Sequence, residues 1–363
     1  MRRLQAAIGM LALVGAALVV SAAPAGAVDV STEAQLQTNF SDVNVTEITL
    51  LNSIDLTCVG GGDLDRDSGN PLTLHGNGFT IRQTCAGERV MELVDADSSG
   101  AGALTLEHVT LTGGDATGQG GAVKYGNPGS GGPITILNST ITGNQATGAG
   151  GGVQLVGPQT MTIIGSTISG NTAQVCAATA EGNPLLLVNS TITGNTSTGP
   201  LGGAVCGDSP AVFVYSTVVG NTAPAGQPAN VNVPQFTSFG SVIGNPIGTS
   251  INCNNGSNTS AGYNYEAGAD TCGFSAATND VVNGADPQLG ALGANGGPTP
   301  TMLPALTSPL VDAIPGASCS GGNTLAGFAV TTDQRGLPRP GVAACDIGAV
   351  ELQPPALRVT FTG

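Results

Sequence analysis

The segment Ile134-TILNSTITG-Asn144 decides the fold, because close copies of it recur along the chain. The copies that align with it without gaps are Met161-TIIGSTISG-Asn171, Leu185-LLVNSTITG-Asn195 and Ala211-VFVYSTVVG-Asn221. A looser copy begins at Leu104, and a copy shifted by one residue begins at Leu72. Such repetition is the signature of a solenoid or a propeller, in which stacked units share one core.

Apolar and polar residues alternate within each copy, as in a β-strand, and a Gly-Asn or Gly-Gly pair then ends the strand. One apolar column, spaced by 30, 30, 27, 24 and 26 residues, consists of Ile81, Leu111, Ile141, Ile168, Ile192 and Val218. Short strands at this period are typical of a parallel β-helix. A propeller blade needs about 40 residues and usually has periodic aromatic residues, whereas 3% of this chain is aromatic. We therefore predict an all-β fold, a single-stranded parallel β-helix.

Polar columns accompany the apolar one. We expect the serine and threonine columns to face outward or to lie at a corner of the coil. We expect the asparagine column to occupy left-handed turns, which asparagine tolerates. The three columns are Ser139, Ser166, Ser190 and Ser216; Thr140, Thr167, Thr191 and Thr217; and Asn144, Asn171, Asn195 and Asn221.

The ends of a solenoid must be covered, because open strand edges promote aggregation. Residues 31–40, with Thr32 and Gln35 at capping-box spacing, predict a short helix that covers the N-terminal end. The segment 286–351, rich in proline and glycine, predicts an irregular C-terminal cap. The expected domains are a leader (1–27), the β-helix with its N-terminal cap (28–285) and the C-terminal cap (286–363).

Residues 1–27 have the pattern of a secretory signal peptide. Arg2 and Arg3 precede an apolar run, and Ala25-Gly26-Ala27 is an A-x-A cleavage site. The run is shorter than the roughly 20 residues that span a bilayer, and no later stretch is long enough either. We expect cleavage after Ala27 and secretion, with an uncleaved N-terminal anchor as the alternative.

Eight cysteines follow this leader, and an even number in an exported chain predicts disulfides. Many pairings are open to eight cysteines. Sequential pairing is favoured because each loop then closes at about one repeat length; the pairs would be Cys58–Cys85, Cys176–Cys206, Cys253–Cys272 and Cys319–Cys345. The chain has no C-x-x-C pair and just two histidines, so the sequence gives no reason to expect a zinc site.

The formal net charge of −15 excludes several partners. Nucleic-acid binding requires a basic footprint, and anionic membranes and polyanions are repelled by an acidic protein. Between Met91 and Thr332, Lys124 is the single lysine or arginine. Acidic polysaccharides are held by cations, so a lyase acting on them is disfavoured. We expect a monomer without a membrane span.

The C-terminal segment contains specific motifs, namely Asp286-PQLGALGANGGPTPTMLPALTSPLVDA-Ile314, Thr332-DQRGLPRP-Gly341 and Cys345-DIGAV-Glu351. They resemble the end of the bacterial "choice-of-anchor Q" proteins, and residues 56–85 are similar to the opening coil of the same group. The resemblance implies a secreted, right-handed β-helix and implies no catalytic residues. The chain departs from the group after Glu351, where no hydrophobic tail or sorting motif follows. Release to the medium is therefore expected rather than anchoring.

Parallel β-helices also occur among polysaccharide-degrading enzymes, and this analogy makes carboxylates of the shaft catalytic candidates. Hydrolysis of a neutral glycan needs two carboxyl groups roughly 5–10 Å apart, and residues one coil apart lie about 5 Å from each other. The main candidates are Glu107, Asp115, Glu181 and Asp208, within a set of shaft acids that also includes Glu92, Asp95 and Asp97. These acids share no repeat column, so solvated loop acids are the simpler interpretation.

The segment Asp63-Leu-Asp65-Arg-Asp67 offers alternating carboxylates that could bind calcium. It is not an EF-hand loop, because Ser68 and Leu74 stand where that motif has glycine and glutamate. An ordinary turn in which Arg66 pairs with one of the acids is the alternative. No cofactor is required by the sequence, and calcium is the one it suggests.

Two further sets of polar residues are expected to be structural. Arg335 and Arg339 should pair with nearby carboxylates and lock the C-terminal cap; the candidates are Asp312, Asp346 and Glu351. His108 falls in the column of Asn138 and Asn189, which indicates a turn residue rather than a catalytic acid or base.

Two functions follow from these patterns. The first is a non-catalytic, disulfide-stapled β-helix outside the cell, an adhesion-type module whose Ser/Thr/Asn-rich faces contact glycans or envelope proteins. The alternative is a secreted carbohydrate-active enzyme, a glycoside hydrolase rather than a polysaccharide lyase, that uses carboxylates on one face.

Overall fold

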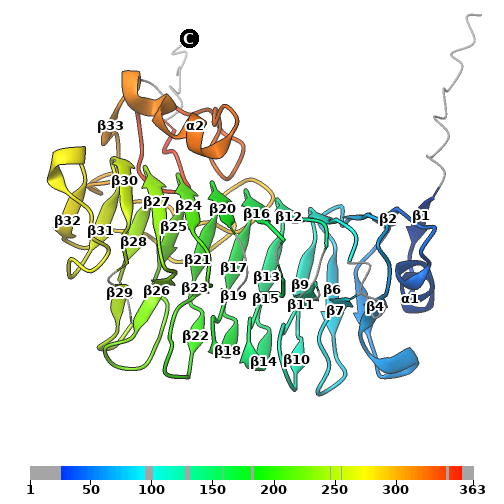
Figure 1. Cartoon of the computed structure of the whole chain (residues 1–363). Coiled ribbons are helices and arrows are strands. Elements are labelled where there is room, and N and C mark those ends of the chain that lie inside the picture. The colour runs from blue at the N-terminus through cyan, green and yellow to red at the C-terminus, as the bar shows by residue number, and fades with distance from the viewer. Residues whose placement is uncertain are drawn as a thin grey trace, which may run out of the picture.

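The computed structural model describes residues 26–353, except 95–100, 127–130, 158, 181–183, 246, 255 and 341–342. Within these residues, the chain winds into a parallel β-solenoid of about eight turns, as predicted (Figure 1). The leader up to Ala25 and three candidate acids, Asp95, Asp97 and Glu181, lie outside the described residues.

Each coil contributes strands to stacked parallel sheets, which we call sheets A to D. Sheet A consists of β1 (Ala27–Val30), β2 (Glu47–Leu50), β5 (Leu72–His75), β8 (Leu104–Glu107), β12 (Ile134–Leu137), β16 (Met161–Ile164), β20 (Leu185–Val188), β24 (Ala211–Val214), β27 (Phe236–Phe239) and β30 (Thr259–Gly262). Sheet B consists of β3 (Ile54–Leu56), β6 (Thr80–Gln83), β9 (Thr110–Thr112), β13 (Thr140–Thr142), β17 (Thr167–Ser169), β21 (Thr191–Thr193), β25 (Thr217–Val219), β28 (Val242–Gly244), β31 (Tyr265–Ala267) and β32 (Val281–Gly284). Sheet C consists of β4 (Leu64–Arg66), β7 (Met91–Leu93), β11 (Val123–Tyr125), β15 (Val153–Leu155), β19 (Thr179–Ala180), β23 (Val205–Cys206), β26 (Pro228–Asn232) and β29 (Ile251–Cys253). Sheet D is shorter and consists of β10 (Asp115–Ala116), β14 (Gln145–Ala149), β18 (Thr172–Val175) and β22 (Thr196–Ser197).

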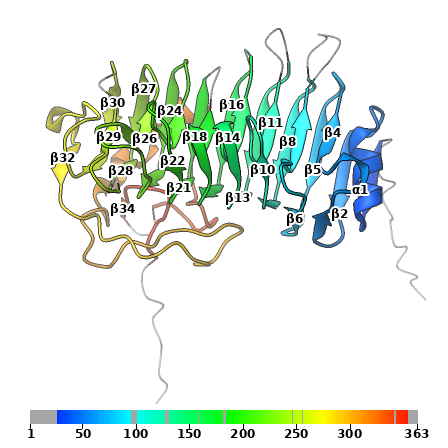
Figure 2. The same cartoon turned by 90° about the horizontal axis from the view of Figure 1, so that it is seen from below.

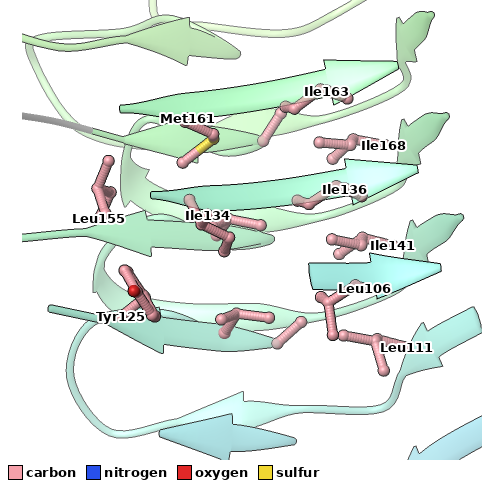
Figure 3. Close-up of a cluster of buried hydrophobic side chains, with 14 of the residues drawn as sticks. Leu106, Leu111, Tyr125, Ile134, Ile136, Ile141, Leu155, Met161, Ile163 and Ile168 are labelled. Atoms are coloured by element: carbon pink, nitrogen blue, oxygen red, sulfur yellow. The ribbon is translucent and has the colours of Figure 1, made fainter. Parts of the chain in front are cut away.

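The alternating apolar residues form continuous columns inside the coil. Ile134 and Ile136 of β12 stand in register with Leu104 and Leu106 of β8, and all four side chains are fully buried. Figure 3 shows these columns meeting the column of Leu111, Ile141 and Ile168 across the core. The column predicted from the repeat spacing, from Ile81 to Val218, is therefore confirmed as a single buried stack.

All four predicted disulfides are present: Cys58–Cys85, Cys176–Cys206, Cys253–Cys272 and Cys319–Cys345. The first two join neighbouring coils, and Cys272 together with Phe274 packs under the last coil, where Phe274 contacts Phe236 edge to face. A cross-link stabilises a fold mainly by restricting its unfolded chain.

The asparagine column lies inside the coil rather than in left-handed turns. The left-handed residues are the preceding glycines, for example Gly194 with φ 67°. Oδ1 of Asn195 accepts hydrogen bonds from the backbone N and the Nδ2 of Asn171, each at 3.0 Å, and Nδ2 of Asn195 donates to Oδ1 of Asn221. Further bonds extend this buried asparagine ladder through Asn230 and Asn252 to the carboxylate of Glu266; its members are Asn144, Asn171, Asn195, Asn221, Asn230, Asn252 and Glu266.

The serine column is also buried, at the corner between sheets A and B. The backbone N of Ser139 donates to Oγ of Ser166, and the backbone N of Ser166 donates to Oγ of Ser190, both at 3.1 Å. This position agrees with the expected corner but not with an outward face. The same corner contains left-handed residues, among them His108 (φ 50°) and Asn138 (φ 46°), which confirms His108 as a turn residue.

A short helix covers the N-terminal end of the core, as predicted. The helix α1 (Glu33–Ser41) begins after Thr32, whose hydroxyl accepts a hydrogen bond from the backbone N of Gln35. Leu36 and Phe40 are fully buried against the first coils.

The C-terminal segment packs along a flank of the solenoid instead of across its end, which differs from the expected cap. Figure 2 shows it running beside the strands from β32 back toward β13. Thr299 donates to the carbonyl of Gly165, and Gln334 donates to Oγ1 of Thr167. The segment includes the pair β33 (Ile314–Pro315) and β34 (Ala344–Cys345) and the turn α2 (Asn323–Ala326), which contacts β24.

This packing covers most of the threonine column. Thr167 and Thr191 are fully buried, and Thr217 is 3% exposed. Their hydroxyls bond to Pro300, Gln334 and the backbone N of Ala349. The threonine column therefore holds the C-terminal segment and is closed to outside partners over these coils.

The two arginines of this segment pair with carboxylates, as predicted. The side chain of Arg339 is fully buried, bonds to Glu351 at 3.0 Å and stacks over the ring of Tyr215 at 4.0 Å. Arg335 pairs with Asp333 at 2.9 Å, a partner that the sequence did not suggest.

Within residues that the structure describes, no helix is long and apolar enough to cross a bilayer.

Candidate functional site

Three charged side chains stand in a row on the outer face of sheet C. Asp65 of β4 is the register partner of Glu92 in β7, which is in turn the partner of Lys124 in β11. Their strand neighbours point into the core, so alternation places all three side chains outside. Parallel pairing thus places the backbone of each of these residues about 5 Å from that of the next, although they lie far apart in the sequence.

Asp63 and Arg89 extend this row into what we call the charged cluster: Asp63, Asp65, Arg89, Glu92 and Lys124. Carboxylate oxygens of Asp63, Asp65 and Glu92 lie within 4.8 Å of one another. Nζ of Lys124 lies 2.6 Å from Glu92, and Arg89 contacts both Glu92 and, at 3.4 Å, Asp63. Two cations therefore partly neutralise three converging carboxylates.

Burial changes the protonation behaviour of this cluster. Loss of solvent, reinforced by the charge of Asp65, raises the pKa of Asp63 to about 6. Loss of solvent, reinforced by the charge of Arg89, lowers the pKa of Lys124. Both effects disfavour the charged form of a group removed from water.

A recess of about 250 Å³ adjoins the cluster, between α1 and β4. Its lining, which we call the N-terminal recess, consists of Gln37, Thr38, Ser41, Gly60, Asp63 and Asp65. Gly60 has φ 69°, and a Cβ there would stand 2.7 Å from Oε1 of Gln37, so glycine lets the loop approach the helix. The recess presents an amide, two hydroxyls and two carboxylates, a set suited to a ligand rich in hydroxyl groups.

The donor chemistry of the cluster fits calcium in part. Carboxylate oxygens are the ligands that calcium prefers, and it takes about six to eight oxygens. Arg89 and Lys124 already bond to these carboxylates, so an entering cation would have to displace them. Asp67 of the predicted aspartate set is not a member of the group of three converging carboxylates, and Glu92 takes its place.

Arg66 does not pair with the neighbouring aspartates as the sequence alternative supposed. Its side chain points into the protein and donates to the carbonyls of Phe40, Asp42 and Val45. It therefore ties the end of α1 to β4 and helps to shape the recess.

The other predicted catalytic acids are not brought together. Glu107 lies on sheet A, Asp115 on sheet D and Asp208 in the loop after β23, so the three acids come from different parts of the coil. Asp208 lines a separate groove of about 270 Å³ beside Cys176 and Cys206. Glu181 lies in the part of the chain that the structure does not describe.

The sequence did not assign either cation of the charged cluster, Arg89 or Lys124, to a site, nor the uncharged residues of the recess. The signal was present in the triplets Leu64-Asp-Arg, Met91-Glu-Leu and Val123-Lys-Tyr, whose central residues are stacked in the structure. These triplets lie on sheet C, whereas the aligned repeat segments, such as residues 134–144, cover strands of sheets A and B, so the alignment did not include them.

Replacing Asp63 with asparagine is expected to stabilise the protein at neutral pH by about 1–2 kcal/mol. The pKa of Asp63 rises from the ordinary 3.8 to about 6 on folding, so the folded state binds its proton more tightly than the unfolded state. Ionised Asp63 therefore lowers the free energy of unfolding. This loss of stability grows as pH rises from about 4 to about 6 and is complete above that range. Each unit of pKa shift corresponds to about 1.4 kcal/mol before solvent screening reduces it.

The measurement is a series of unfolding midpoints between pH 4 and pH 7.5, with Asp115→Asn as the matched control on sheet D. The wild type should gain stability as pH falls through about 6, and Asp63→Asn should lack this gain. If the unfolding midpoints of wild type and Asp63→Asn changed with pH in parallel, the raised pKa of Asp63 would be contradicted.

Comparison with known proteins adds one match. A family model described as "Putative pectate lyase-like adhesive domain" matches residues 27–148, about a third of the chain. These residues include α1, the N-terminal recess and the whole charged cluster. No curated protein and no solved structure matches the chain. The match stops before the C-terminal segment, whose likeness to choice-of-anchor Q proteins remains an expectation.

Proposed function

We propose that this protein is a secreted, adhesion-type binding module that binds glycans at the N-terminal recess and the adjoining charged cluster. The observation that carries the proposal is their position: every residue of the recess and the cluster lies within the segment that is similar to an adhesive domain. The four disulfides, with no free cysteine, fit a protein that works outside the cell.

The lining of the recess supports a hydroxyl-rich ligand. Carboxylates accept hydrogen bonds from sugar hydroxyls, and the amide of Gln37 and the hydroxyls of Thr38 and Ser41 can both donate and accept. Strand pairing and α1 hold these groups in place before a ligand arrives, which lowers the entropy lost on binding.

The Ser/Thr/Asn-rich columns do not supply this surface. The serine and asparagine columns are internal, and the C-terminal segment covers the threonine column from Thr167 onward. We therefore assign the binding surface to the first coils and not to the repeat columns.

A glycan screen of the purified protein tests the proposal, scored for retention and for released reducing ends. Asp65→Asn should weaken retention about tenfold, since a hydrogen bond to a charged acceptor contributes about 1.5–3 kcal/mol and tenfold corresponds to about 1.4 kcal/mol. Asp115→Asn, which removes the same charge on sheet D, should bind as the wild type does.

Unchanged glycan retention by Asp65→Asn would contradict the assigned site. Failure to retain any glycan, together with binding to an envelope protein, would assign the module to a protein partner instead.

A second candidate is a glycoside hydrolase at the same place, favoured by the raised pKa of Asp63. A carboxyl that keeps its proton near pH 6, beside further carboxylates within 4.8 Å, resembles the acid and nucleophile pair of a retaining enzyme, whose carboxyl groups lie about 5 Å apart. Released reducing ends that disappear in Asp63→Asn would establish this function; retention without release supports the binding module.

A further inference from the structure

A groove of about 270 Å³ lies beside the Cys176–Cys206 disulfide, and we call it the disulfide groove. It is formed by β26 and by the loops next to β23, β26 and β29. In Figure 1, β26 and β29 lie toward the end of the solenoid opposite to β4, so this groove is remote from the charged cluster. Its lining includes Leu201, Asp208, Asn232, Val233, Pro234 and Asn254.

The side-chain amides of the groove are oriented by bonds to backbone carbonyls. Nδ2 of Asn232 donates to the carbonyl of Leu201, and Nδ2 of Asn254 donates to the carbonyl of Val233 at 2.8 Å. These bonds fix which end of each amide is the nitrogen and which is the acceptor oxygen. Oδ1 of Asn254 is buried and has no hydrogen-bond partner among the residues that the structure describes. Because a buried acceptor without a donor is costly, the groove favours a ligand that donates hydrogen bonds.

Asp208 adds a negative charge to the same groove. In the part of the chain that the structure describes, its carboxylate forms no ion pair and accepts no hydrogen bond. The sequence has no lysine or arginine between Lys124 and Arg335, and the formal net charge of the chain is −15. A ligand of opposite charge is favoured at such a surface. The expected hydrogen-bond donor is therefore a cation.

Apolar side chains complete the groove. Leu201 is 59% exposed, Pro234 is also exposed, and Val233 is buried beside them. Exposed apolar surface favours the methylene stem of a long side chain, whose charged end stays at the polar groups. The volume of about 270 Å³ is below the roughly 300–1,000 Å³ of pockets that hold drug-sized ligands. The groove therefore suits a single side chain.

We propose that the disulfide groove binds the side chain of a lysine that a protein partner presents. The ammonium group bonds to Asp208 and Asn232, the buried oxygen of Asn254 adds to the negative potential there, and the methylene stem packs on Leu201 and Pro234. An ammonium is a compact charge with three donors on a flexible stem, which suits acceptors from separate side chains. The proposal does not depend on glycan binding at the N-terminal recess.

Two substitutions test the charge and the apolar contact with little risk to the fold. Asp208→Asn removes the charge while keeping the shape of an exposed loop residue. Leu201→Ser removes an exposed apolar side chain and keeps the carbonyl to which Asn232 donates. Asp115→Asn is the matched control, because it removes the same charge on sheet D.

The experiment is a titration of the full chain with N-acetyl-lysine methylamide, followed by the NMR signals of the side-chain amides of Asn232 and Asn254. We expect both sets of signals to shift and to saturate. Asp208→Asn should weaken binding at least about tenfold, the effect of losing a hydrogen bond to a charged acceptor. Leu201→Ser should weaken it about threefold, and Asp115→Asn should bind as the wild type does. N-acetyl-norleucine methylamide, which keeps the stem without the ammonium, should not bind.

Amide signals of Asn232 and Asn254 that do not move with the lysine probe would overturn the proposal. So would equal affinity of wild type and Asp208→Asn, or equal affinity for the lysine and norleucine probes. Tighter binding of free pentylamine would assign the groove to a small amine, and displacement of the lysine probe by Ca²⁺ would assign it to a metal ion. Either result would overturn the assignment to a protein partner.

Discussion

Replacing Arg339 with alanine is expected to lower the free energy of unfolding by about 3–5 kcal/mol, the usual cost of breaking a buried ion pair. The guanidinium is fully buried, bonds to Glu351 at 3.0 Å and donates to the carbonyls of Asp346 and Gly348. Alanine would leave the carboxylate of Glu351 buried without its cation and would empty the space over the ring of Tyr215.

The loss should be concentrated in the C-terminal segment, because Arg339 bonds to other residues of that segment and stacks on Tyr215 of the solenoid. Denaturant unfolding gives the total effect, and limited proteolysis reports whether residues 286–353 become cleavable while the solenoid stays intact. Arg82→Ala is the matched control, since Arg82 also pairs with a carboxylate, that of Asp55, but with both side chains half exposed. Equal unfolding midpoints for the two variants would mean that Arg339 does not lock the segment.

Replacing Asn195 with leucine is expected to cost about 3 kcal/mol, because it interrupts the asparagine ladder near its middle. The backbone N of Asn171 and the carbonyl of Ile168 would each lose a partner that Asn195 provides. A buried polar group without its partner costs about 1–3 kcal/mol. Leucine has the same branching as asparagine but is larger, so no cavity forms and the strain of overpacking adds to the lost bonds.

Hydrogen exchange separates this effect from general destabilisation. The backbone amide of Asn171 should lose protection before the amides of the first coils do. Thr196→Ala, which changes the next residue on the outer side of sheet D, should shift stability by less than about 0.5 kcal/mol. A ladder variant as stable as this control would contradict the role of the buried amides.

The apolar column from Ile81 to Val218 could be predicted because strand alternation and repeat spacing together determine which residues stack. The disulfide pairing followed from the same spacing, since Cys58–Cys85 and Cys176–Cys206 join neighbouring coils. The short helix over the N-terminal end could be predicted because its capping residues, Thr32 and Gln35, are local in sequence.

The direction of the asparagine side chains could not be predicted in this way. A repeat reveals that Asn144, Asn171 and Asn195 are equivalent, but alternation fails at a corner, where one residue more or less in the turn exchanges inside for outside. The glycine before each asparagine takes the left-handed conformation, and this frees the amide to point inward.

The path of the C-terminal segment could not be predicted from the sequence either. A segment rich in proline and glycine has no periodicity that would reveal which surface it covers. The contact between Gln334 and Thr167 depends on tertiary packing across most of the β-helix. Similarly, the charged cluster depends on pairing between coils of unequal loop length. The sequence shows that Asp65 and Glu92 are acidic, but it does not show that they are register partners.

The asparagine ladder has a consequence for how such a protein can change its size. Each internal amide accepts from one neighbour and donates to the next, so a coil between two asparagines is an interchangeable module with matching ends. The steps of 27, 24 and 26 residues between successive asparagines from Asn144 to Asn221 show that loop length varies freely while the ladder keeps its contacts. Duplication or loss of a whole coil during evolution would therefore lengthen or shorten the rod by about 4.8 Å. The residues at the two ends would not need to change.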